Sequence, residues 1–332
     1  MDRIRPHHGE LSGRADRRRL CHHRLPGVSD GGYHRTVLHH KGGETMTITH
    51  RQYRLLSDHM AVYQFMLDVY ERDWRNGVAA PFLEYALSSD WMDKSFVHRN
   101  RLWFDGERIV AFVFHENPVT DVYFSLRPGY EFLADEMVGY ALTGMPQKDG
   151  RNKLIIFGAQ TALIAAAQRA GLKRTWSDWD MQYDFSKPLD YPLPEGFRFA
   201  QQPLDVAKCS QCCWKGFNHE ETEGPWDGDI EYTGALLTAP HQTAHMDVAV
   251  ENEQGEYVCY AGMWWTPENR LAYMEPLCTV PAYRRKGLAA AVLSEMYRRT
   301  SALGATHMTG GTDPFYARIG YEPAVEWTYW ER

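Results

Sequence analysis

The chain has no apolar run approaching the roughly 18 residues that a membrane-spanning helix needs. It also lacks the polar, charge-dominated composition of a disordered protein, since 44% of its 332 residues are hydrophobic and 24% are charged. We therefore expect a globular protein with no membrane partner. A length of 332 residues exceeds what one ordinary core holds and suits two domains of about 150 residues each.

An excess of positive charge is absent as well. The net charge is −7, which is the wrong sign for a protein that binds nucleic acid by neutralising phosphates. We expect no nucleic-acid partner, and a cationic small substrate would suit this charge better.

Cysteines are few, six in 332 residues, and no secretion signal precedes them, so no disulfide framework is expected. Cys209, Cys212 and Cys213 form a C-x-x-C-C cluster, but no second pair follows at the spacing of a zinc site. The cluster is interpreted as buried reduced thiols on a helix. We expect no metal cofactor and a cytoplasmic protein.

Residues 1–45 differ from the rest of the chain. They hold seven of the fifteen histidines and nine basic against five acidic residues, whereas the remainder has 27 basic and 38 acidic residues. No helix or strand period runs through them, which predicts a disordered leader. Lys41-Gly42-Gly43 lies shortly before Met46 and can be encoded by a stretch like a bacterial ribosome-binding site, so Met46 is the predicted start. A basic arm for an anionic partner and an ordinary disordered tail are the alternatives.

The hydrophobic patterns predict helices and strands in the same order in two segments, 46–187 and 195–332, with the Pro-rich stretch 188–194 as their linker. In the second segment we expect strands at 197–200, 245–251, 257–265, 271–280, 305–309 and 325–329, and helices at 204–217, 230–238, 288–303 and 314–319. In the first we expect strands at 102–104, 109–115, 122–125, 153–157 and 179–185, and helices at 132–142 and 160–169.

A basic loop opens the helix expected at 288–303. Residues 280–289 read Val-Pro-Ala-Tyr-Arg-Arg-Lys-Gly-Leu-Ala. Backbone N–H groups at a helix N-terminus bind anions, and the basic neighbours strengthen this. The sequence is neither a Walker loop nor G-x-G-x-x-G, and it predicts a pyrophosphate site.

Two motifs resemble one family. Arg284-x-x-Gly287-x-Ala289 resembles the acetyl-CoA loop [QR]-x-x-G-x-[GA] of the Gcn5-related N-acetyltransferase (GNAT) superfamily, and residues 314–321, Pro-Phe-Tyr-Ala-Arg-Ile-Gly-Tyr, resemble its F-Y-x-x-x-G-[FY] segment. The resemblance covers 191–332. It implies an α+β protein of two tandem GNAT-like domains, similar to mycothiol synthase-like acetyltransferases, each with a mixed, mostly antiparallel sheet flanked by helices.

The resemblance also implies the site. Acetyl-CoA, as co-substrate, would contact Cys278, Thr279, Val280, Arg284, Arg285, Lys286, Gly287, Leu288 and Ala289. Amides near Leu277 and Cys278 would polarise the thioester, on a strand that Pro276 suggests is bulged. Tyr316 would protonate the thiolate and Glu275 would relay a proton from the amine. A packed aromatic and a salt-bridge partner are the alternatives for these two.

The first segment departs from the family pattern. Residues 125–132, Ser-Leu-Arg-Pro-Gly-Tyr-Glu-Phe, lack Gly-x-[GA], and nearby acidic residues would repel a pyrophosphate. We therefore expect 46–187 to be a degenerate copy and 195–332 to be the catalytic domain that binds acetyl-CoA.

The polar loop 219–227 lies where the family builds its acceptor pocket, so His219, Glu220 and Trp226 are the predicted acceptor-binding residues. A solvated acidic loop is the alternative. The predicted function is transfer of acetyl to a primary amine of a small molecule or peptide by direct attack, in a possible homodimer. A non-catalytic acyl-CoA-binding regulator and an aminoacyl transferase that uses charged tRNA are the alternatives.

Overall fold

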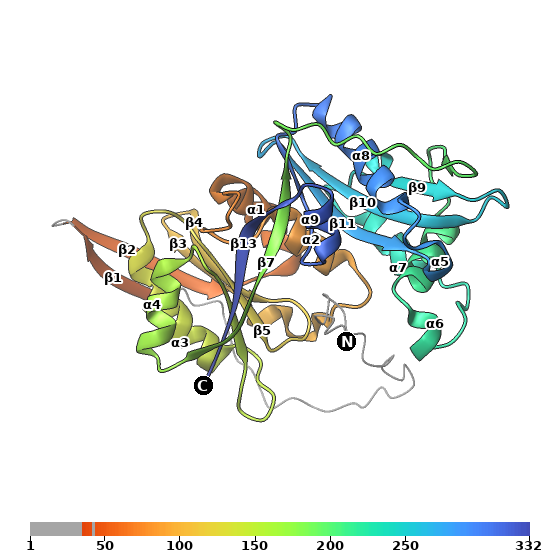
Figure 1. Ribbon diagram of the computed structural model, residues 1–332. Helices are drawn as coiled ribbons and strands as arrows, with labels where there is room; N and C mark the ends of the chain where they lie inside the picture. The colour runs from red at the N-terminus through yellow and green to blue at the C-terminus, as the bar shows by residue number, and fades with distance from the viewer. Residues whose placement is uncertain (1–34, 42–43) are drawn as a thin grey trace.

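The computed structural model describes residues 35–41 and 44–332, and its strands form one continuous mixed sheet (Figure 1). The strands are β1 (Arg35–Lys41), β2 (Glu44–Gln52), β3 (Arg101–Asp105), β4 (Arg108–His115), β5 (Asp121–Leu126), β6 (Lys153–Phe157), β7 (Lys173–Asp184), β8 (Arg198–Phe199), β9 (Val248–Glu251), β10 (Tyr257–Thr266), β11 (Leu271–Thr279), β12 (His307–Thr309) and β13 (Glu322–Glu331).

The helices are α1 (Leu55–Val69), α2 (Ala80–Ser88), α3 (Ala134–Gly144), α4 (Thr161–Arg169), α5 (Val206–Gly216), α6 (His219–Thr222), α7 (Glu231–Gly234), α8 (Leu288–Ser301) and α9 (Pro314–Arg318). Short 3₁₀ turns are η1 (Lys94–Arg99), η2 (Glu131–Leu133), η3 (Ala235–Thr238), η4 (Ala244–Met246) and η5 (Pro281–Tyr283). The sequence analysis predicted no element between residues 46 and 101, where β2, α1, α2 and η1 lie.

The two halves of the chain exchange their closing strands. The sheet order is β1-β2-β3-β4-β5-β6-β13-β7-β12-β11-β10-β9-β8, so β13 lies between β6 and β7, and β7 pairs with β12. In Figure 1 the green β7 and the blue β13 run side by side through the middle of the molecule. The predicted separate sheet for each domain is therefore wrong. The physical reason is that β7 and β13 are both long strands, of 12 and 10 residues, and pairing them leaves neither edge unpaired.

Part of the predicted leader is a strand. Residues 35–41 form β1, which pairs antiparallel with β2 from Glu44 onward. The expectation of irregular structure is wrong for these residues, because β1 satisfies the outer edge of β2, whose other edge pairs with β3. Residues 1–34 and 42–43 lie outside the described residues, and the predicted start at Met46 stays a prediction.

Each half of the sheet is covered on both faces. In the N-terminal half, Phe112 and Phe114 point toward α1 and α2, while Val113 between them points toward α3 and α4. In the C-terminal half, α8 packs on one face and α5 on the other. The aromatic core around Trp327 also contains Trp264 of β10, so the two halves share one hydrophobic cluster.

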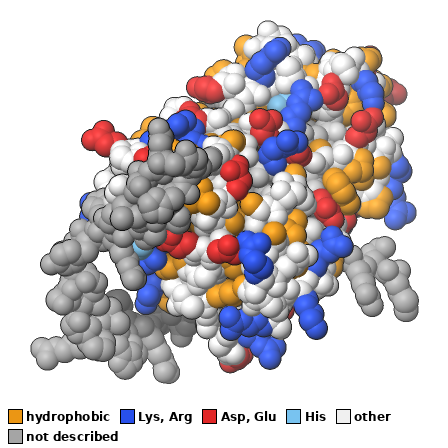
Figure 2. All heavy atoms as spheres, turned by 90° about the vertical axis from the view of Figure 1, so that its left-hand side faces the viewer, with side chains coloured by type: hydrophobic (Ala, Val, Ile, Leu, Met, Phe, Trp, Pro, Cys, Tyr) orange, Lys and Arg blue, Asp and Glu red, His pale blue; other side chains and the backbone are white. Residues whose placement is uncertain are grey.

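Charges are mixed on the surface that Figure 2 presents, where basic and acidic side chains are interspersed on the side of the N-terminal half. No helix within residues 35–41 and 44–332 has the length and apolarity that crossing a membrane would take.

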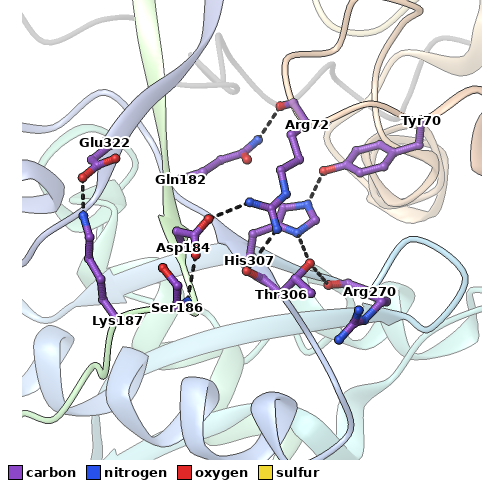
Figure 3. Close-up of polar contacts among 10 residues, drawn as sticks. All are labelled: Tyr70, Arg72, Gln182, Asp184, Ser186, Lys187, Arg270, Thr306, His307 and Glu322. Atoms are coloured by element: carbon purple, nitrogen blue, oxygen red, sulfur yellow. Dashed lines mark hydrogen bonds and ion pairs between the residues drawn. The ribbon is translucent and has the colours of Figure 1, made fainter.

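A polar cluster around the buried His307 joins the halves at β7 and β12 (Figure 3). The Tyr70 hydroxyl lies 2.6 Å from His307 Nε2, and Thr306 Oγ1 lies 2.9 Å from the other ring nitrogen. Arg72 donates to Asp184 at 2.8 Å. These contacts connect the end of α1 to strands of both halves.

This cluster predicts an acid-sensitive fold. Burial, with help from Arg72, lowers the pKa of His307 to about 3. Below a pH of about 6.5, His307 is protonated in the unfolded chain but stays neutral in the folded chain. The free energy of unfolding therefore falls as the pH falls. Replacing His307→Gln should therefore reduce the loss of unfolding free energy between pH 7 and 5 by about 2 kcal/mol. Urea unfolding at both pH values measures this. The same change in unfolding free energy between pH 7 and pH 5 in both proteins would contradict the prediction.

Candidate active site

The N-terminus of α8 is an open anion-binding cradle. Gly287, with φ of 86°, is the residue before the helix, and Arg285 also has a positive φ, of 62°. Within the described part of the chain, no acceptor faces the backbone N–H groups of residues 285–290. Residues 284–287 are exposed, whereas Leu288 packs into the core. The geometry fits the predicted pyrophosphate loop, because such N–H groups and the helix dipole favour an anion.

The basic side chains of this loop do not all point to one place. Arg284 donates to the carbonyl of Gly216 and to Asn218 Oδ1, both at 2.8 Å, so it caps the end of α5. Lys286 lies with Nζ 5.0 Å from the centre of the Tyr283 ring. The guanidinium of Arg284 anchors the loop to α5, and the predicted contact of Arg284 with the cofactor stays a prediction. Arg285 and Lys286 are the cations next to the cradle.

Strands β11 and β12 separate soon after they begin. They pair in parallel only at Leu271 with His307 and at Ala272 with Met308. On its other edge, β11 has a bulge against β10. Ala261 pairs with Leu277 and Met263 pairs with Met274, so one residue of β10 lies opposite two residues of β11. The bulge is at Glu275 and Pro276, in agreement with the prediction from Pro276. It opens one edge of β11 toward the α8 side of the fold.

Backbone alternation decides which amides of β11 face this opening. Val280 donates to Val258 of β10 at 3.0 Å, so the N–H of Cys278, two residues earlier, also points to β10. The N–H groups of Leu277 and Thr279 therefore face β12. Leu277 keeps its predicted place, whereas the amide of Cys278 does not reach the opening.

The side chain of Cys278 points into the cluster of thiols on α5. Its Sγ lies 3.9 Å from the Sγ atoms of Cys212 and Cys213. Gly216 packs against it so closely that a β-carbon there would lie 2.7 Å from Cys278 Cβ. The described cysteines are free and buried, as expected.

A cavity of about 420 Å³ lies between the α5–α7 side and strands β10 and β11. Its apolar wall is formed by Pro203, Leu204, Val206, Leu236, Leu237, Met263 and Trp264, and its polar wall includes Gln202, Thr243, His245, Asp247 and Glu275. Glu275 and Pro276 of the bulge form one end. Sequence reasoning missed these walls. The one available signal was Gly262, a glycine inside a strand, whose β-carbon would lie 2.5 Å from the Glu275 carbonyl.

Two carboxylates line this cavity. Glu275 Oε2 accepts a hydrogen bond of 2.5 Å from Tyr273, a hydroxyl whose pKa is raised well above its ordinary value by burial and by Glu275. Asp247 accepts from Tyr260 at 2.7 Å and from the Met263 N–H at 2.9 Å. Burial raises the pKa of Asp247 to about 7. The cavity thus combines two carboxylates with a largely apolar wall.

Tyr316 lies in α9, directly after β12. It is 8% exposed, and its ring packs 5.1 Å from the Tyr321 ring and against Gly310 and Gly311. Burial, followed by the charges of Asp180 and Glu275, raises its pKa above the ordinary value, so the phenol is protonated at neutral pH. Its hydroxyl makes no hydrogen bond within the described residues.

The predicted acceptor residues lie elsewhere. None of His219, Glu220 and Trp226 lines the cavity. His219 pairs with Glu223 at 2.7 Å, and Trp226 donates to the Asp229 carbonyl at 3.2 Å. Helix α6, which holds His219 and Glu220, begins directly after Asn218, the partner of Arg284, so it lies beside the basic loop.

The first segment holds no matching cradle. At residues 125–132 the N–H of Gly129 is already bound by Glu131 Oε1 at 2.8 Å. The guanidinium of Arg127 is buried against the Ile109 carbonyl and Asp68. A bound carboxylate at this position leaves no place for a phosphate.

Residues 208–321 match the model of the acetyltransferase (GNAT) family, and they contain the cradle, the bulge and Tyr316. The match is to an acetyltransferase (GNAT) domain in the C-terminal part of the chain. The protein is therefore an acyltransferase, and the matched family uses acyl-CoA. Its mixed α/β fold is also GNAT-like, and the sheet is mostly antiparallel, as predicted.

Solved structures show the same fold. A GCN5-related N-acetyltransferase from Sphaerobacter thermophilus is 14% identical, with a TM-score of 0.53 over 86% of this chain and 95% of that one. A tandem GNAT protein from the clavulanic acid biosynthesis pathway is 12% identical, with a TM-score of 0.50 over 86% of this chain and 98% of that one. No curated protein sequence matches this chain significantly.

Proposed function

We propose that this protein transfers the acetyl group of acetyl-CoA to a primary amine held in the cavity at Glu275. One observation carries the proposal. The cavity ends at the bulge of β11, and the other edge of that same strand opens toward β12 and the α8 cradle. A thioester and an amine could therefore meet at β11 from opposite sides and react directly, with no acyl-enzyme.

Each group has a place in this reaction. The cradle N–H groups, Arg285 and Lys286 would bind the pyrophosphate. The N–H groups of Leu277 and Thr279 would stabilise the oxyanion that forms on the thioester carbonyl. As the amine nitrogen bonds to the carbonyl carbon, Glu275 accepts the ammonium proton through water. When the carbon–sulfur bond breaks, Tyr316 donates its proton to the thiolate.

The cavity walls support a class of acceptor. Glu275 and Asp247 favour an ammonium group at one end, and the apolar residues around Leu236 and Trp264 favour a hydrocarbon or aromatic body behind it. A free small-molecule amine fits this enclosed shape, and the terminus of a peptide with an apolar first side chain is the second candidate.

An amine series tests this function. Linear primary amines of increasing length should be acetylated with kcat/KM rising about fourfold per buried methylene, until the 420 Å³ cavity is filled. Release of free CoA thiol measures the rate. Replacing Glu275→Gln should lower kcat/KM by a similar factor for every amine of the series. Acetyl-CoA binding with no turnover of any amine would indicate the regulator instead, and a preference for polar, multiply charged amines would contradict the apolar acceptor.

A further inference from the structure

Three potential metal ligands meet outside the active site, at the contact between the two halves. Glu84 of α2 receives a hydrogen bond of 2.8 Å from His59 Nε2 of α1 and one of 2.7 Å from His241 Nδ1. Both bonds end on Oε2, while Oε1 accepts the His241 backbone N–H at 2.7 Å. The three ligand atoms lie within 4.8 Å of one another.

The charge of Glu84 needs compensation. Glu84 is 1% exposed. Within the described part of the chain, its ion-pair partners are His59 and His241, with no lysine or arginine. Both oxygens of this buried carboxylate accept hydrogen bonds, and a carboxylate charge at such a position is costly without a cation.

We propose that His59, Glu84 and His241 bind a divalent transition-metal ion of the zinc type. Two imidazole nitrogens and one carboxylate oxygen are a ligand set that zinc prefers. Tetrahedral ligands at such an ion lie about 3.3 Å apart, so the two rings would have to move outward by roughly half an ångström. The side chains of His59 and His241 are 14% and 30% exposed, which leaves a fourth position open to water.

The surroundings hold the two rings in place. The His241 ring stacks on Tyr63 with centroids 3.7 Å apart and an angle of 6° between planes. The second nitrogen of His59 lies 3.4 Å from the Tyr53 hydroxyl. Contacts of this kind orient the rings of metal-binding histidines. His241 precedes Gln242 and Thr243 of the cavity wall, so an ion here would tie that wall to α1 and α2.

Metal titration of the full chain tests the proposal. The seven histidines of residues 1–45 can also bind metal, so the measurement is a difference between variants. After chelation and dialysis, the wild type should bind one Co²⁺ more per chain than Glu84→Gln, with the visible absorption of tetrahedral Co²⁺. A hundredfold excess of Zn²⁺ over its Kd should raise the wild-type Tm by about 5 °C but not that of the variant.

Matched variants complete the test. His59→Gln and His241→Gln each remove one ligand at a partly exposed position, so they keep the test valid if Glu84→Gln does not fold. His98→Ala removes an exposed histidine of η1, bonded to the Ser95 carbonyl, and should bind as the wild type does. Equal Co²⁺ stoichiometry in the wild type and the ligand variants, or equal Tm shifts, would overturn the proposal and leave a proton-bridged cluster.

Discussion

Replacing Gly287→Glu is expected to abolish acetyl-CoA binding. The residue precedes α8 with φ of 86°, where a side chain is strained, and its N–H belongs to the cradle. A carboxylate here also places negative charge where the pyrophosphate would bind. Isothermal titration calorimetry should find one site per chain in the wild type and none in the variant.

Gly129→Glu is the matched control, because Gly129 has a similar φ of 90° in the corresponding loop of the first segment. It carries the same strain and the same added charge, and it should leave binding unchanged. A wild-type stoichiometry of two, or loss of binding in this control, would contradict the assignment of a single cradle.

Replacing Tyr316→Phe is expected to lower kcat by about 10²–10⁴-fold with little change in the Kd for acetyl-CoA. The variant keeps the packing against Tyr321, Gly310 and Gly311 and removes only the hydroxyl. Burial keeps this phenol protonated, so a proton is available to the departing thiolate, but the raised pKa makes the phenol a weak acid. Single-turnover kinetics with a good amine acceptor would isolate the chemical step.

Tyr321→Phe provides the comparison. Tyr321 belongs to the same aromatic cluster, is 3% exposed, and has a buried hydroxyl with no hydrogen-bond partner in the described part of the chain. Its loss should not reduce kcat. Full activity of Tyr316→Phe, or an equal decrease in both variants, would assign Tyr316 to packing and leave solvent as the proton donor.

The sequence by itself determined the features that depend on neighbours along the chain. The residues before α8 predict a helix start with exposed N–H groups, because a glycine with positive φ and small first-turn residues are local requirements. The alternation of apolar residues likewise predicted β10, β11 and α8 close to their actual bounds. The bulge at Pro276 belongs to this class, since proline removes one donor from the ladder.

Tertiary structure alone decided the features that need partners far apart in the sequence. The exchange of β7 and β13 depends on which long strand meets which, and both strands have the same pattern whether they close their own sheet or the other. The contacts of Arg284 with Gly216 and Asn218 could not be predicted, because these residues approach it only in the fold. His59, Glu84 and His241 lie on three elements, so no spacing rule could have joined them. The cavity beside α5, which the 219–227 loop does not line, could not be predicted for the same reason, because a cavity is what packing leaves between elements and no single segment encodes it.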